Sequence, residues 1–157
     1  MILRALVVLF VCMTPYGCDQ LSKPDHALKM ENPVNYFEIP VSDLPRAVKF
    51  YESVFELKLE TKTIDGNQMA VFHGSVDGPG IIGALALGPS YKPSTDGTRV
   101  YFATKSIDAV LGRVLKNGGR IEYPKTDVGE IGFVAEFIDS EGNRIALHQP
   151  PVHKGPR

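Results

Sequence analysis

Apolar and polar side chains alternate in several short stretches of the chain, and two other stretches repeat their apolar residues at helical spacing. Alternation is typical of a β-strand with one packed face, whereas spacing of three and four residues is typical of an amphipathic helix. Helices are expected from Leu44 and from Ile107, with Ser42-Asp43 and Ser106 as their N-caps. Strands are expected at residues 35–41, 58–64, 68–73, 81–87, 99–103, 120–123, 131–138 and 144–148.

The alternation also assigns the faces of the strands. In the first strand Phe37 and Ile39 are expected on the packed face, and in the last strand Ile145 and Leu147. The opposite faces carry polar, aromatic and small side chains. These are Tyr36, Glu38, Arg144, Ala146 and His148.

The order of the predicted elements repeats. An offset of about 62 residues superposes Leu44 on Ile107 to within one position and Ala84 on Ala146. Each copy has the order β-α-β-β-β, over residues 33–88 and 98–149 of a domain at 33–150. In each copy the helix covers one face of the strands. The sequence therefore predicts an α+β fold in which two tandem βαβββ units pair into a curved eight-stranded mixed sheet, whose uncovered faces form a cup.

The first residues differ in kind from this domain. Residues 1–18 combine a basic start, an apolar core and a small residue before Cys18, which looks like a bacterial lipoprotein signal peptide with Cys18 as the lipidated residue. Residues 19–32 would be a tether and 151–157 a tail, with membrane contact through the lipid anchor only. This predicts a lipoprotein of the bacterial cell envelope. Translation from Met30 would instead give a cytoplasmic protein.

Charge and cysteine content narrow the function classes. A net charge of −1 and a pI near 6.4 give no basic surface for nucleic acid. Both cysteines, Cys12 and Cys18, lie in the signal region, so the folded domain has no thiol, disulfide or cysteine metal site. Motifs for nucleotide binding and for a Ser-His-Asp triad are also missing from the sequence.

Two motifs carry a family resemblance. The opening FEIPVSDLPRAVKFYESVF and the closing FIDSEGNRIALH, at the two ends of the repeat, resemble the vicinal oxygen chelate superfamily, which includes lactoylglutathione lyase, bleomycin-resistance proteins and extradiol dioxygenases. The resemblance implies the tandem βαβββ fold, a homodimer, and in many members a divalent metal held by one ligand on each of four strands.

In this sequence the four metal-ligand positions of the family fall on Tyr36, Ala84, Arg99 and Ala146. Alanine has no ligand atom and arginine carries a fixed positive charge, so this set does not suit a metal ion. No metal cofactor is therefore expected. The alternative is a divalent metal at a displaced site built from Glu38, His73 and His148.

The cup is expected to hold a small organic, anionic molecule, because the side chains aimed into it suit ligand binding. These are Tyr36, Glu38, Arg99, Tyr101, Arg144 and His148. Residues 88–94 and 124–132 either cover its mouth or are plain connections. Two other functions remain open: a metal-dependent lyase or isomerase of the lactoylglutathione lyase type, and a non-catalytic scaffold in which Glu38 and Arg99 form an internal ion pair.

Overall fold

The computed structural model describes residues 34–73 and 80–151. The expected signal peptide, the lipidated Cys18, the tether and nearly all of the tail lie outside these residues. Within the described part of the chain, no helix has the length and apolar character needed to cross a membrane.

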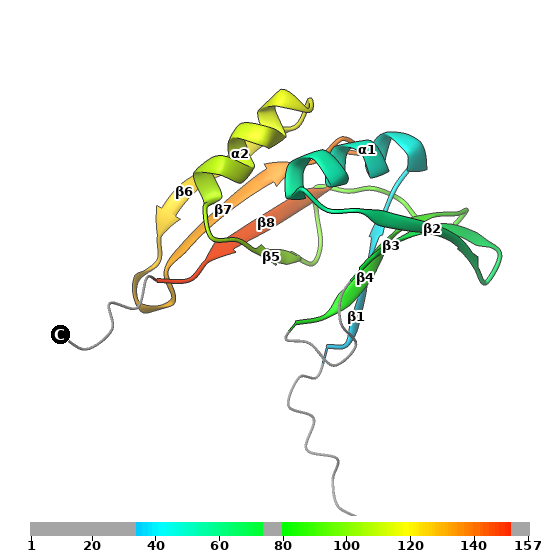
Figure 1. The fold of residues 1–157 in the computed structure, drawn as a ribbon, viewed down its shortest axis with the longest axis horizontal. Helices are drawn as coiled ribbons and strands as arrows, with labels where there is room; N and C mark the ends of the chain where they lie inside the picture. The colour runs from blue at the N-terminus through cyan, green and yellow to red at the C-terminus, as the bar shows by residue number, and fades with distance from the viewer. Residues whose placement is uncertain (1–33, 74–79, 152–157) are drawn as a thin grey trace, which may run out of the picture. The chain divides into compact units, whose positions relative to one another are not determined.

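Two βαβββ modules follow each other along the chain (Figure 1). The first module consists of β1 (Tyr36–Pro40), α1 (Leu44–Phe55), β2 (Leu59–Ile64), β3 (Asn67–Phe72) and β4 (Ile82–Leu87). The second module consists of β5 (Tyr101–Ala103), α2 (Ile107–Lys116), β6 (Arg120–Asp127), the short 3-10 helix η1 (Gly129–Ile131), β7 (Phe133–Ile138) and β8 (Arg144–Gln149). The α+β class and the repeated unit are thus confirmed.

The eight strands are divided between two four-stranded sheets, with the orders β1-β4-β3-β2 and β5-β8-β7-β6. In each sheet the first and last strands of the module pair in parallel, β1 with β4 and β5 with β8. The other neighbouring strands pair antiparallel. The sequence predicted that the modules join into one continuous sheet. The outer edge of β1 instead borders a cavity whose other wall includes Lys92, Ser94 and Thr98, and there the Pro40 carbonyl accepts a hydrogen bond from the Asn143 side chain at 2.8 Å.

The bounds of β5 and β6 differ from the prediction for structural reasons. Arg99 precedes β5, because regular pairing with β8 begins at Tyr101, next to the point where the Ala146 amide donates to the Val100 carbonyl at 3.0 Å. The segment before that point turns at Gly97, whose φ of 110° favours glycine. β6 extends to Asp127, beyond Pro124, because it is an edge strand whose pairing with β7 shifts register twice and so tolerates a proline.

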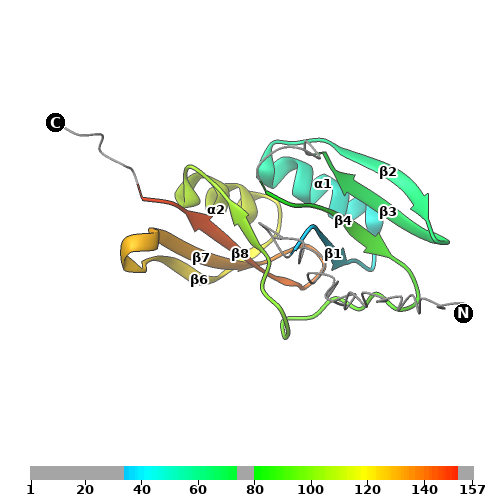
Figure 2. The same cartoon turned by 90° about the horizontal axis from the view of Figure 1, so that it is seen from below.

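Both helices begin where their N-caps predict. The Asp43 side chain accepts from the Arg46 amide, and the Ser106 side chain accepts from the Ala109 amide. α1 lies against β3 and β4, and α2 lies against β6, β7 and β8, as both views show (Figures 1 and 2). The helices also contact each other, so the covered faces of both sheets share one hydrophobic core.

Aromatic rings from both modules meet in this core. Phe102 of β5 lies 4.5 Å from Phe55 of α1 and 5.8 Å from Phe37 of β1, between ring centroids. Phe50 of α1 lies 6.2 Å from Phe137 of β7. Large rings bury much apolar area each, so these contacts join the two modules into one folded body.

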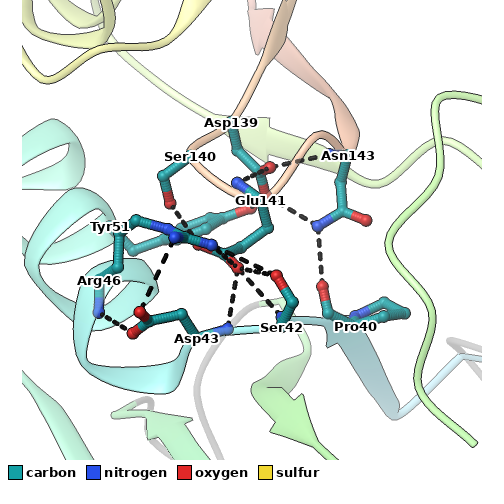
Figure 3. Close-up of polar contacts among 9 residues, drawn as sticks. All are labelled: Pro40, Ser42, Asp43, Arg46, Tyr51, Asp139, Ser140, Glu141 and Asn143. Carbon is teal, nitrogen blue, oxygen red and sulfur yellow. Dashed lines mark hydrogen bonds and ion pairs between the residues drawn. The ribbon is translucent and has the colours of Figure 1, made fainter.

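The turn between β7 and β8 is a second link between the modules (Figure 3). The Glu141 side chain is fully buried, and its Oε2 accepts from the backbone amides of Ser42 and Asp43 at 3.0 Å each. The Arg46 guanidinium binds both carboxylate oxygens at 2.8 Å. Burial alone would raise the pKa of Glu141, but the hydrogen bonds from Arg46, Ser42 and Asp43 outweigh it and lower this pKa to about 2.

Asp139 of the same turn is also buried and hydrogen-bonded. Its carboxylate accepts from the Tyr51 hydroxyl at 2.7 Å and from the Asn143 side chain at 3.0 Å. Burial raises the pKa of Asp139, although the hydrogen bonds from Asn143 and Tyr51 oppose the rise. Burial, followed by the charge of Asp139, raises the pKa of Tyr51 well above its usual value. This closing motif therefore holds the fold rather than a ligand.

Candidate functional site

The uncovered face of the second sheet carries one row of three side chains. Strand pairing places Tyr101 of β5 and Glu136 of β7 on either side of Ala146 of β8. Cross-strand partners share a face of the sheet, so all three project away from the helices. Tyr101 is 51% exposed and Ala146 is fully buried. An exposed aromatic ring and a carboxylate thus flank a small methyl group, as the alternation predicted for Tyr101 and Ala146.

Two arginines converge on Glu136. The Arg99 Nε lies 3.7 Å from the Glu136 Oε2, and the Arg144 Nε donates a short hydrogen bond to the same oxygen. The Glu136 side chain is 14% exposed, against 25% for Arg99 and 30% for Arg144. Arg99 therefore pairs with Glu136 and not, as the scaffold hypothesis required, with Glu38. The cluster carries two positive charges and one negative charge.

His148 and Tyr101 line a hollow of about 430 Å³ on this face, which we call the tyrosine hollow. Its other walls are apolar, from Ala103, Val134 and Ile131, the last of which is 62% exposed. The His148 Nε2 lies 2.7 Å from the Ile131 carbonyl oxygen. A carbonyl only accepts hydrogen bonds, so Nε2 is the donor in this contact.

On the first sheet the uncovered face is partly covered by the chain itself. Tyr91, in the loop after β4, packs on a small cluster of Met69, Ala84 and Ala86. Its hydroxyl donates to the Glu38 Oε2 at 2.7 Å, and this hydrogen bond is the main cause that raises the pKa of Tyr91. One of the two expected covers, the loop at residues 88–94, therefore does contact the uncovered face.

Tyr36 precedes Glu38 on the same face of β1 and is 38% exposed. Burial, followed by the charge of Glu38, raises the pKa of Tyr36. The tyrosine is therefore a neutral hydroxyl at physiological pH. It offers ring area and a hydrogen-bond donor beside the carboxylate.

A cavity of about 320 Å³, the junction cavity, lies where β1, the segment 92–100 and the start of β8 meet. Glu38 of the first module and Arg144 of the second both line it. Of the six predicted ligand-binding residues, these two therefore share a cavity. Tyr101 and His148 share the tyrosine hollow, Arg99 joins Arg144 at Glu136, and Tyr36 lies beside Glu38.

The four family ligand positions do not suit a metal in this chain. Ala84 and Ala146 are fully buried and have no donor atom. Arg99 brings a fixed positive charge that repels a cation, and Tyr36 alone supplies no chelating set.

The alternative metal set is not assembled either. His73 lies 3.8 Å from Glu60 at the end of β3, Glu38 binds Tyr91, and His148 binds a backbone carbonyl. Among residues 34–73 and 80–151, no group of three His, Cys, Asp or Glu side chains is close enough together to hold a metal ion.

Two residues of the site were not identified from the sequence. Glu136 lies on the polar side of the alternating stretch 131–138, so alternation predicts the face of the sheet on which it lies. Alternation does not predict its partners, because they come from β8 and from the segment before β5. Tyr91 lies in a loop without periodicity, where no sequence pattern indicates which way its side chain points. Only its aromatic character in a Gly/Pro-rich stretch was a signal.

Comparison with characterised sequences finds a protein of Mycobacterium bovis named Putative glyoxylase CFP32. It is 25% identical over 125 residues, which make up 77% of this chain and 47% of that protein. The chain thus spans about half the length of this curated relative.

Two solved structures have a similar fold. TnmS3, an antibiotic binding protein from Streptomyces sp. CB03234, is 26% identical with a TM-score of 0.57, over 76% of this chain and 97% of that one. Glyoxalase I of Leishmania major is 21% identical with a TM-score of 0.58, over 75% of this chain and 86% of that one.

The family model for the Glyoxalase/Bleomycin resistance protein/Dioxygenase superfamily matches residues 33–147, which cover the first module and its opening motif entirely, and the second module and the closing motif up to Leu147 of β8. This chain belongs to that superfamily.

Proposed function

We propose that this domain binds a small, partly apolar organic anion on the uncovered face of its second sheet, without the metal that many relatives use. The observation that carries the proposal is the cluster of Arg99, Glu136 and Arg144. Two guanidinium groups share one carboxylate there, so one positive charge is left uncompensated within the cluster.

A guanidinium group suits a carboxylate or enolate ligand because its planar nitrogens donate in parallel. Arg99 uses Nη1 for the Gly97 carbonyl and Nε for Glu136, and Arg144 uses Nε for Glu136. The terminal nitrogens of Arg144 have no partner among the described residues. They are therefore available to an anion.

The apolar part of the ligand would lie in the tyrosine hollow. Tyr101 supplies an exposed ring next to Ala146, and Val134 and Ile131 supply aliphatic walls. Such pockets, mostly apolar with a few polar groups that fix orientation, are typical of small-molecule sites. The likeness to TnmS3, an antibiotic binding protein, supports a binding role.

A thermal-shift screen of aromatic and aliphatic carboxylates tests the proposal. Carboxylates should raise the melting temperature of the wild type, because a ligand that binds only the folded state stabilises it. Arg99→Ala should weaken their binding about tenfold, because it leaves Arg144 and Glu136 as a neutral pair and so removes the uncompensated positive charge of the cluster.

Arg120→Ala is the matched control, since Arg120 is an exposed arginine of β6 that is paired with Glu122 and separated from Arg144 by β7. It should bind the same acids as the wild type. Carboxylates that bind Arg99→Ala as tightly as the wild type would contradict the proposal, and so would a screen whose only hits are neutral hydrocarbons or cations.

A further inference from the structure

The junction cavity contains both signs of charge. Lys92 and Arg144 are its positive groups, and Glu38 and Asp96 are its negative groups. Within the described residues, Lys92 and Asp96 take part in no ion pair, and Glu38 binds only the uncharged Tyr91. A cavity with unneutralised charges of both signs is complementary to a ligand that itself carries both.

Glu38 is held in place on one side only. Tyr91 donates to its Oε2 at 2.7 Å, and the Tyr91 ring is fixed by packing on Met69 and Ala86. The other oxygen, Oε1, has no hydrogen-bond donor within the described part of the chain. The carboxylate is thus pre-positioned with one acceptor oxygen free.

The backbone of β1 adds a second acceptor. The Val41 amide bonds to Ala86 on β4, whereas the Pro40 carbonyl accepts from Asn143 on the opposite side. Peptide groups of successive residues in a strand point to opposite edges. The Glu38 peptide groups therefore point the same way as those of Pro40, toward the outer edge of β1 that borders the junction cavity.

A carboxylate oxygen and a backbone carbonyl, without a competing cation bound to either, form a site for an ammonium group. Arg144 is the link to the anion site, because it lines the junction cavity and also belongs to the cluster at Glu136. A ligand held there by its carboxylate can extend an amine toward Glu38.

We propose that the ligand is a zwitterion of the amino-acid class, with its carboxylate at Arg144, its ammonium group at Glu38, and an apolar side chain. This inference rests on the proposed function, since it takes the same carboxylate contact and adds recognition of the amine. Tyr91 is the positioning residue for Glu38.

Calorimetric titration of the full chain with three matched probes tests the inference. L-Phenylalanine, 3-phenylpropanoate and 2-phenylethylamine share one ring and two-carbon spacer, and they carry both charges, only the carboxylate, and only the amine. The wild type should bind phenylalanine about fivefold more tightly than 3-phenylpropanoate, which is the size expected for an ion pair at a partly exposed carboxylate. Phenylethylamine should bind more weakly than phenylalanine.

Glu38→Gln should remove the preference for phenylalanine over 3-phenylpropanoate, because a neutral amide no longer pairs with the ammonium group. Tyr91→Phe should reduce the same preference by releasing Glu38. Glu60→Gln, at an exposed carboxylate of β2, is the control and should behave as the wild type.

The outcomes separate this inference from the proposed function. If the wild type binds phenylalanine and 3-phenylpropanoate equally well, or if Glu38→Gln keeps the preference for phenylalanine, the amine site is refuted while anion binding stands. If the wild type binds none of the three probes, both proposals are contradicted.

Discussion

At the scale of single residues, Glu141 links the two modules, because its buried carboxylate binds Arg46 and two amides at the start of α1. Glu141→Gln should lower the free energy of unfolding by about 2 kcal/mol near neutral pH, since a neutral amide replaces a charge-assisted acceptor. Urea denaturation measures the loss. Glu130→Gln, at an exposed residue of η1, should be neutral, and equal midpoints for both variants would contradict the account.

The same variant makes a prediction about pH. The pKa of Glu141 is about 2 in the folded protein, below its ordinary value of 4.5, so its ionised form stabilises the fold above pH 4.5 and this contribution is lost as the pH falls from 4.5 to about 2. The stability difference between wild type and Glu141→Gln should therefore shrink on acidification. Asp139, whose raised pKa acts with the opposite sign, is present in both proteins. A difference that stays constant down to about pH 2 would contradict this reading.

The faces of the site residues were predictable, but their partners were not. Alternation placed Glu38 and His148 on the uncovered faces because a strand turns successive side chains to opposite sides. The partner of Arg99 is decided by which strands become neighbours, and a one-dimensional pattern does not contain that information. Arg99 consequently pairs with Glu136 of β7 rather than with Glu38.

At the scale of elements, two glycines should respond in opposite ways to alanine. Gly112 lies inside α2, and a Cβ there would meet no atom within 4 Å, so Gly112→Ala should stabilise by about 0.5 to 1 kcal/mol through helix propensity. Gly119 follows α2, and its Cβ would lie 2.8 Å from the Ile138 carbonyl oxygen. Gly119→Ala should therefore destabilise by about 1 kcal/mol or more. Thermal denaturation of both variants is the measurement, and shifts of the same sign would count against the packing described.

The helices were predictable because their signals are local. A capping side chain and the apolar spacing after it are both contained within about one turn of sequence, as at Asp43 and Ser106. β6 was predicted too short because Pro124 is a local stop signal. Its position on an edge strand with an irregular register, which allows the proline, is a property of the sheet.

At the scale of the whole domain, the shared core predicts cooperative unfolding. Phe102 of the second module packs on Phe37 and Phe55 of the first, so neither module keeps its core when the other unfolds. Far-ultraviolet circular dichroism, which reports on backbone structure, and tyrosine fluorescence should give coincident denaturation curves. Two separated transitions would show that the modules fold independently.

The repeat predicted two modules of the correct order, but not how their edges meet. Each module leaves β1 or β5 at the edge of its sheet, and the sequence pattern is compatible with pairing these edges. Asn143 and the segment 92–100 lie beside the outer edge of β1 instead, which opens the junction cavity. That arrangement depends on hydrogen bonds between residues far apart in the sequence, which local sequence patterns do not predict.

The central claim is that the domain binds an organic anion through arginine and not through a metal. Calorimetric titration of chelator-treated protein with 3-phenylpropanoate, with and without added zinc, tests it most directly. Binding through arginine predicts a saturable isotherm with the same affinity in both conditions, and about tenfold weaker binding by Arg99→Ala. Binding that appears only after zinc is added, and is unaffected by Arg99→Ala, would contradict it.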